Sequence, residues 1–195
     1  MRKLKPVACL LGAAALIASA SASAAIIDTV QAPTPYFVPS DSQKFSWPYY
    51  RWNGDDWSWS HNPIAGPITS AWLMISAFDV DAPYEVDEIW ADDNGTPVTL
   101  GTLAGADDVW NFTWFSLDSA LFDDIQNGLQ VGIRIDVNDD GWAVTLAKSV
   151  LCVNPENAQV ECMRNPNPGV PEPASLALMG LGLAGLAAAR RRKTA

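Results

Sequence analysis

The sequence predicts an all-β domain, an antiparallel β-sandwich of the jelly-roll kind, between a signal peptide and a single-span C-terminal helix. Residues 129–137 alternate between apolar and polar side chains, which is the period of a strand with one buried face. Residues 68–78 are apolar at both parities, as in a central strand covered on both sides. The runs 88–91 and 98–103 flank residues 92–95, whose sequence Asp-Asp-Asn-Gly is typical of a hairpin turn.

The other elements follow in chain order. Residues 25–46 contain three prolines and are expected to form an extended lead-in. Residues 110–115 and 142–152 are β-rich and predict two further strands. Leu117, Leu121 and Ile125 recur at helical spacing before Asn127-Gly128, which predicts one or two helical turns. Short strands at roughly ten-residue spacing indicate a sandwich or jelly roll. The predicted order is signal peptide 1–24, lead-in 25–46, β-sandwich 47–164, linker 165–169 and C-terminal signal 170–195.

The N-terminus predicts export. Arg2, Lys3 and Lys5 precede the apolar run 7–18, and Ala22-Ser23-Ala24 offers a small-x-small cleavage site. We therefore expect the mature chain to begin near Ala25.

The C-terminus combines three features in a fixed order. Val170-Pro171-Glu172-Pro173 comes first, then the apolar run 174–189, then the basic cluster Arg190, Arg191, Arg192 and Lys193. The apolar run makes a helix of roughly 24 Å, short of the ~30 Å hydrocarbon core, so it is a marginal span. The basic cluster should remain cytoplasmic and leave the body outside.

This C-terminus resembles the PEP-CTERM sorting signal of Gram-negative bacteria. The resemblance implies an exported precursor that is held transiently in the inner membrane, cut near Pro171-Glu172-Pro173 by an exosortase, and delivered to the cell surface or the extracellular space. Exosortase and the inner membrane are therefore expected partners.

The charge of the body excludes some partners. Seven of the 12 basic residues lie in the two end clusters, and all 22 acidic residues lie between them, so the exported part carries a formal charge of −17. Such a charge argues against nucleic acid as a partner and favours cation binding or simple solvation.

The cysteines predict one disulfide. Cys9 leaves with the signal peptide, and Cys152 and Cys162 remain as a pair in an exported chain. Their spacing and the absence of a nearby histidine disfavour a redox or metal pair.

Two acidic runs are candidate Ca²⁺ ligands. Asp136, Asn138, Asp140 and Gly141 follow the pattern D-x-N-x-D-G, in which alternating oxygen ligands precede a glycine bend. The twelfth position is Ala147 rather than Glu, so the loop is not an EF-hand and needs carboxylates from elsewhere. The run 79–88 can supply them, with Asp79, Asp81 and Asp87 as the expected ligands. The alternative is that both runs are solvated acidic loops.

Nine tryptophans suggest a second candidate site. Trp52, Trp57 and Trp59 lie in one aromatic segment and could stack on sugar rings, the alternative being packing within the core. Asp56–Asn62, Ser76–Asp81, Leu100–Leu103 and Gly141-Trp142 also resemble β-sandwich ectodomains found ahead of PEP-CTERM tails. That resemblance implies a jelly-roll-like extracellular module and no reaction.

These observations together favour a structural or adhesive protein of the biofilm or exopolysaccharide matrix, with extracellular polysaccharide as a possible partner. A Ca²⁺-dependent carbohydrate-binding module is the alternative, and a glycoside hydrolase is the third interpretation. We expect no enzymatic activity, because His61 is the sole histidine and there is no Gly-x-Ser-x-Gly elbow or phosphate-binding glycine loop.

Overall fold

The domain consists of two antiparallel sheets. The computed structural model describes residues 25–138 and 140–163. The first sheet contains β1 (Ile26–Gln31), β2 (Tyr50–Trp52), β4 (Ala71–Phe78), β7 (Trp110–Leu117) and β9 (Ala143–Val153). The second contains β3 (Trp57–Ser60), β5 (Glu88–Asp93), β6 (Thr96–Thr102) and β8 (Gln130–Arg134). Short helical turns are η1 (Asp41–Gln43), η2 (Ser119–Leu121), α1 (Phe122–Asn127) and α2 (Ala158–Glu161).

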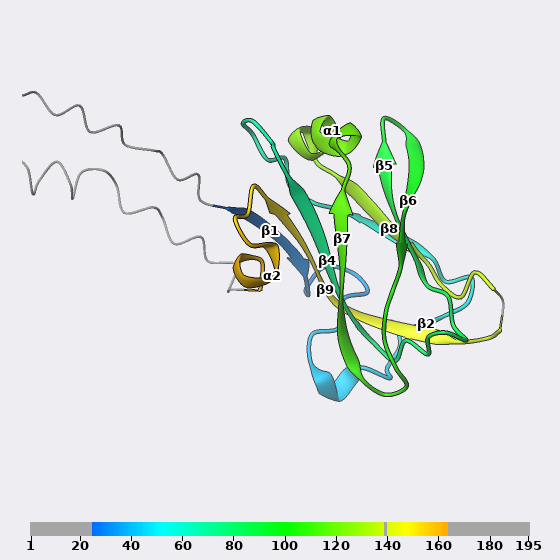
Figure 1. Cartoon of the computed structure of the whole chain (residues 1–195). Helices are drawn as coiled ribbons and strands as arrows, with labels where there is room; N and C mark the ends of the chain where they lie inside the picture. The colour runs from blue at the N-terminus through cyan, green and yellow to red at the C-terminus, as the bar shows by residue number, and fades with distance from the viewer. Residues whose placement is uncertain (1–24, 139, 164–195) are drawn as a thin grey trace, which may run out of the picture.

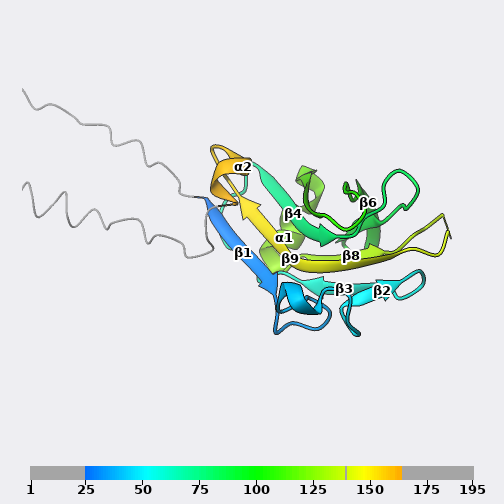
Figure 2. The same ribbon diagram turned by 90° about the horizontal axis from the view of Figure 1, so that it is seen from below.

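The strand order is that of a jelly roll. The first sheet runs β1-β9-β4-β7, with β2 also paired to β9, and the second runs β3-β8-β5-β6. The pairs β1–β9, β3–β8, β4–β7 and β5–β6 are therefore nested inside one another along the chain, and all are antiparallel. This nesting folds one long hairpin over into two layers (Figures 1 and 2).

The core lies between the two sheets. Alternate residues of the central strands point into it, among them Leu73 and Ile75 from β4, Ile89 from β5, and Val131 and Ile133 from β8. The opposite side of β4 is also covered, since Met74 is fully buried although it points away from this core. The prediction of a central strand buried on both faces is confirmed.

The predicted β5–β6 hairpin is confirmed. Asn94 and Gly95 both adopt positive φ, 51° and 86°, and Asp93 pairs with Thr96 across a two-residue turn. Two consecutive positive φ values define the turn that matches strand twist, which is why Asn-Gly stands there. The helical turns expected over 117–125 are also present, as η2 and α1.

The segment 25–46 belongs to the domain itself. It was expected to precede the sandwich, but residues 26–31 form the edge strand β1 on β9, and Phe37 bridges to Leu146 and is fully buried. The three prolines lie after β1, so they do not interrupt the pairing.

A disulfide joins β9 to α2. Cys152 and Cys162 are linked and both are buried, as the sequence predicted. Asn157 caps α2 by accepting a hydrogen bond from the Val160 amide, so the closed loop is also ordered locally.

Replacing both Cys152 and Cys162 with serine should lower the free energy of unfolding by about 2–3 kcal/mol, because the unfolded chain regains the entropy of a short open loop. Denaturant titration of the oxidised wild type and the double variant measures the difference. Equal midpoints for the two proteins would contradict a stabilising role for the disulfide.

Candidate functional site

One end of the sandwich holds a buried row of carboxylates, which we call the acidic row: Glu85, Asp87 and Asp136. Asp87 immediately precedes β5, and Asp136 follows β8, its pairing partner in the second sheet. The Asp136 amide donates to Asp87 Oδ1 at 3.0 Å. All three side chains are buried, and each has one carboxylate oxygen without a hydrogen-bond donor: Glu85 Oε1, Asp87 Oδ2 and Asp136 Oδ1.

Electrostatics inside the acidic row favour protonation or a counter-charge. Burial raises the pKa of Glu85, and the neighbouring charge of Asp87 raises it further. Burial also raises the pKa of Asp87, with the charges of Asp136 and Asp56 adding to the effect.

The D-x-N-x-D-G loop is organised around Asp136. Its Oδ2 accepts from the amides of Gly141 and Trp142, at 2.6 and 3.0 Å, and its φ of 48° ends the alternation of β8. Asn138 points elsewhere: it donates to the Tyr84 carbonyl and accepts from the Val86 amide. Asp140 is exposed and accepts from Asn138. Of the predicted Ca²⁺ ligands, Asp87 and Asp136 therefore come together, whereas Asn138 ties the loop to the run 79–88 and Asp140 contacts Asn138 within the loop.

Asp79 lies in a separate group. One oxygen each of Asp79, Asp107 and Asp108 lies within 4.8 Å of the others, and Asp107 and Asp108 are exposed. Both oxygens of Asp79 already have donors, the Tyr50 hydroxyl and the Asp108 amide, each at 2.8 Å. Asp81 is half-buried beside this group, and burial raises its pKa together with the charges of Asp79, Asp107 and Asp108. The expected single site thus divides into two acidic groups.

Sequence reasoning did not name Glu85 as a ligand. The sequence shows that Glu85 lies in the acidic run and shares a strand face with Asp87. It does not show that Glu85 is buried. The structure buries it because the 79–87 connection folds back, with Glu85 Oε2 accepting from the Asp81 amide at 2.8 Å.

Two of the three proposed sugar-stacking tryptophans do not face solvent. Trp57 and Trp59 are only 9% and 6% exposed, and their rings pack edge-on against Tyr36 and Phe37 in the core. Both point inward because they occupy alternate positions of β3. Of the three, only Trp52, at 52% exposed, is available to a ligand.

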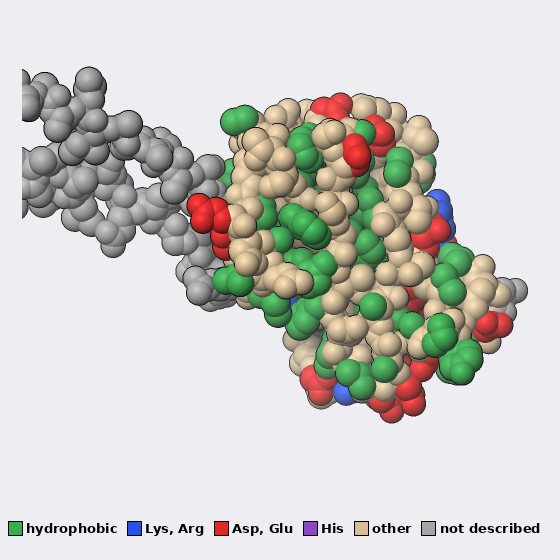
Figure 3. Space-filling view, in the orientation of Figure 1, with side chains coloured by type: hydrophobic (Ala, Val, Ile, Leu, Met, Phe, Trp, Pro, Cys, Tyr) green, Lys and Arg blue, Asp and Glu red, His purple; other side chains and the backbone are tan. Residues whose placement is uncertain are grey.

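Trp52 is the end of a line of contacting aromatic side chains on the outer side of the first sheet, which we call the aromatic row. Ring centroids lie 5.2–5.6 Å apart from each member to the next. The members in order are Trp52, Tyr50, Phe45, Phe78 and Trp110. Figure 3 shows hydrophobic side chains in patches over one face of the molecule, with acidic side chains mostly around its edges.

The sole histidine lies in a hydrogen-bonded line with an aspartate and a serine. Asp28 Oδ2 lies 2.9 Å from His61 Nδ1, and His61 Nε2 lies 2.9 Å from Ser149 Oγ. Burial raises the pKa of Asp28, but hydrogen bonds from His61 and Asn62 outweigh it and lower that pKa to about 2. The ionised Asp28 can only accept, so His61 donates to it from Nδ1, and its Nε2 forms the second hydrogen bond with the Ser149 hydroxyl.

This Asp–His–Ser line is connected in the same order as a hydrolase triad, but a substrate cannot reach it. Ser149 has no exposed surface and His61 is 2% exposed, so no substrate carbonyl can reach the hydroxyl. Asp28 lies on β1 and Ser149 on β9, both in the first sheet, and His61 directly follows β3 of the second sheet. The three side chains therefore connect the two sheets. Asp28 and His61 are 33 residues apart in the sequence, and His61 and Ser149 are 88 residues apart. No local sequence pattern therefore predicts these contacts.

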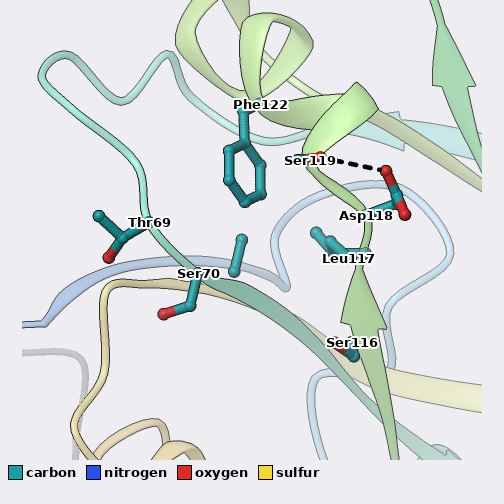
Figure 4. A pocket seen from close by; sticks show the side chains of 8 residues that line it. Thr69, Ser70, Ser116, Leu117, Asp118, Ser119 and Phe122 are labelled. Carbon is teal, nitrogen blue, oxygen red and sulfur yellow. Dashed lines mark hydrogen bonds between the residues drawn. The ribbon is translucent and has the colours of Figure 1, made fainter.

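A shallow pocket of about 390 Å³ lies between the start of β4 and the end of β7 (Figure 4). Serine and threonine side chains and Phe122 line it, together with Asp118. The Asp118 carboxylate is already engaged, since it caps η2 by accepting from the Ala120 amide at 2.9 Å. Asp118 is the charged side chain in this lining, and one of its two carboxylate oxygens is used by the cap.

The fold and the sites define a class: a disulfide-linked jelly-roll domain with buried carboxylates at one end and a row of aromatic side chains on its first sheet. Residues 169–193 match the PEP-CTERM protein-sorting motif, so the chain carries the signal of an exported, exosortase-sorted protein. No curated protein matches the chain.

Both predicted targeting segments lie outside the described residues. This applies to the signal peptide 1–24 and to the motif Val170, Pro171, Glu172 and Pro173 with its following span and basic cluster. Within residues 25–138 and 140–163, none of the helices has the length and apolar character needed to cross a membrane.

Proposed function

We propose that this chain is a non-catalytic structural or adhesive protein of the cell surface, retained in the biofilm or exopolysaccharide matrix after exosortase processing. The observation that carries the proposal is the PEP-CTERM motif at 169–193, placed directly after a disulfide-linked jelly roll. A disulfide is retained in an oxidising compartment, which agrees with export.

The sealed Asp–His–Ser line supports a non-catalytic role. Ser149 would be the nucleophile of a hydrolase, yet it has no exposed surface. The buried carboxylates Glu85 and Asp87 also differ from a glycosidase pair, because both lack solvent access for a sugar chain.

The aromatic row favours polysaccharide as the partner. Trp52 and Phe45 are about half exposed, and flat aromatic faces offer apolar contact to the C–H faces of sugar rings. Asp41 and Asp79 border the row, where they accept hydrogen bonds from Trp110 Nε1 and the Tyr50 hydroxyl. With a formal charge of −17 on the exported part, a neutral polysaccharide fits better than an acidic one. A Ca²⁺-dependent carbohydrate-binding module is the second candidate. It is favoured by Asp79, Asp107 and Asp108, which each offer one oxygen within 4.8 Å of the others, next to Tyr50 of the aromatic row.

Replacing Trp52 and Phe45 together with alanine should weaken retention on the neutral polysaccharide of the producing cell about tenfold or more, since two stacking faces are lost. Affinity electrophoresis through gels containing that polysaccharide measures the retention. Val98→Ala is the control, because Val98 is exposed on β6 of the other sheet.

Three results would each count against the proposal. Equal retention of the wild type and the double variant would exclude the aromatic row. Loss of retention in Val98→Ala would indicate a different surface. Release of reducing sugar by the wild type would make the protein a glycoside hydrolase.

A further inference from the structure

Trp90 lies in the middle of the outer face of the second sheet. Its neighbours Ile89 and Ala91 are buried in the core, so alternation along β5 turns Trp90 to the opposite face. Gly132 of β8 is the residue paired directly with it. A Cβ atom at position 132 would overlap the indole atoms Cε2, Cζ2 and Nε1, so the ring of Trp90 covers the glycine. Gly132 is therefore buried although it belongs to the outer face of the sheet.

The other side of the Trp90 ring is directed to solvent. Trp90 is half-buried, and among the described residues no aromatic ring and no cationic side chain stacks on it. Small polar side chains end the same row of the sheet: Ser58 on β3 pairs with Gly132, and Thr99 on β6 pairs with Trp90. Both are exposed, so the indole forms a flat apolar platform with a polar border.

Two polar pairs flank this platform along the strands. Arg134 and Gln130 stand two residues to either side of Gly132 on β8. Arg134 forms an ion pair with Glu88, and Gln130 Nε2 donates to Ser58 Oγ at 3.1 Å. Each pair keeps hydrogen-bonding capacity beyond its internal contact, because a guanidinium carries five N–H donors and an amide also offers an oxygen acceptor.

We propose that this surface, which we call the Trp90 face (Ser58, Trp90, Thr99, Gln130 and Arg134), binds a neutral polysaccharide by stacking one pyranose ring on Trp90. The C–H face of a pyranose fits a flat indole, and the hydroxyl groups at the edge of the sugar reach the flanking polar side chains. The ligand is neutral because the Arg134 charge is already balanced by Glu88 and the exported part carries a formal charge of −17.

This inference rests on the proposed polysaccharide partner but not on the aromatic row. The aromatic row lies on the outer side of the first sheet and the Trp90 face on the outer side of the second, so the sandwich separates them. One domain with both surfaces holds two polysaccharide chains, which gives a matrix protein a means of cross-linking them.

The competing role of Trp90 is structural, in which its ring only shields the backbone of Gly132. Trp90→Ala does not separate the two roles, because it removes the platform and uncovers the glycine together. Thr99→Arg does separate them, since it keeps Trp90 on Gly132 and lets a guanidinium lie over the open side of the ring. Thr96→Arg is the matched control: it adds the same charge to the same strand, and a separation of three residues turns it to the opposite face.

The test is affinity electrophoresis of the full-length chain, in excess detergent, through gels that contain the neutral exopolysaccharide purified from the producing cell. We expect Thr99→Arg to weaken retention about threefold or more relative to the wild type, and Thr96→Arg to leave it unchanged. In the Trp52→Ala/Phe45→Ala variant, which lacks the exposed faces of the aromatic row, adding Thr99→Arg should remove the remaining retention.

The outcomes separate this inference from the role of the aromatic row. Equal retention of Thr99→Arg and the wild type would overturn the inference and leave Trp90 with the structural role. Complete loss of retention in Trp52→Ala/Phe45→Ala would assign all binding to the aromatic row and also overturn it. A dimer in sedimentation that Thr99→Arg dissociates would assign the face to a second copy of the chain instead. Retention that is lost in Thr99→Arg but unchanged in Trp52→Ala/Phe45→Ala would support the Trp90 face and contradict the aromatic row.

Discussion

Replacing His61 with alanine is expected to lower the free energy of unfolding by about 3 kcal/mol. His61 connects Asp28 on β1 to Ser149 on β9, and both contacts are 2.9 Å long. Its loss removes two hydrogen bonds, one of them to an ionised group, and leaves a cavity and a buried Ser149 hydroxyl without its partner.

A pH series separates this explanation from a simple packing loss. The pKa of Asp28 is lowered to about 2 in the folded protein from 3.8, so Asp28 contributes stability that is present above about pH 4 and lost as the pH falls through 2. In His61→Ala the pKa of Asp28 should rise, and the loss of stability should begin at higher pH with a smaller amplitude. Urea titrations from pH 2 to 7 measure the free energy of unfolding at each pH. Ser149→Ala is the control, because it keeps the Asp28–His61 contact. An unaltered pH profile in His61→Ala would show that the contact with Asp28 does not stabilise the fold.

The sequence predicted those parts of the fold that depend on local patterns. Alternation identified β8, uniform apolarity identified β4, and Asn94-Gly95 identified the β5–β6 hairpin. Each of these patterns involves only residues that are neighbours in the sequence, so it can be recognised without a structure. The β1 strand was not predicted, because three prolines within residues 33–39 indicated an extended segment. The short apolar run before them was included in that segment, although it forms the strand.

The sites depended on contacts between distant segments, and the sequence predicted them only in part. Asp87 and Asp136 were expected to meet, and the pairing of β5 with β8 brings them together. Trp57 and Trp59 were expected to be partners of Trp52, but strand parity turns them into the core. Nothing local to Ser149 indicates its contact with His61, because that contact exists only once the two sheets have packed together.

Replacing Glu172 with alanine is expected to leave the precursor uncut in the inner membrane of a host that contains exosortase. The match to the PEP-CTERM motif spans 169–193, and Glu172 is the charged residue between Pro171 and Pro173. Pro171 and Pro173 have no backbone N–H to donate, so we expect the Glu172 side chain to give the processing enzyme a specific contact. A neutral methyl group in its place removes that contact without lengthening or shortening the span behind it.

Immunoblotting of membrane, periplasmic and extracellular fractions distinguishes the larger precursor from the processed protein. Glu156→Ala is the matched control, because Glu156 is exposed, precedes α2 and lies outside the motif. The control should be processed like the wild type, and both should remain uncut in a host that lacks exosortase. Because the jelly-roll domain lies upstream of the motif, the uncut Glu172→Ala precursor should still carry the Cys152–Cys162 disulfide, so a failure of processing cannot be attributed to misfolding. Normal release of Glu172→Ala would mean that the enzyme recognises the span and the basic cluster rather than the acidic residue.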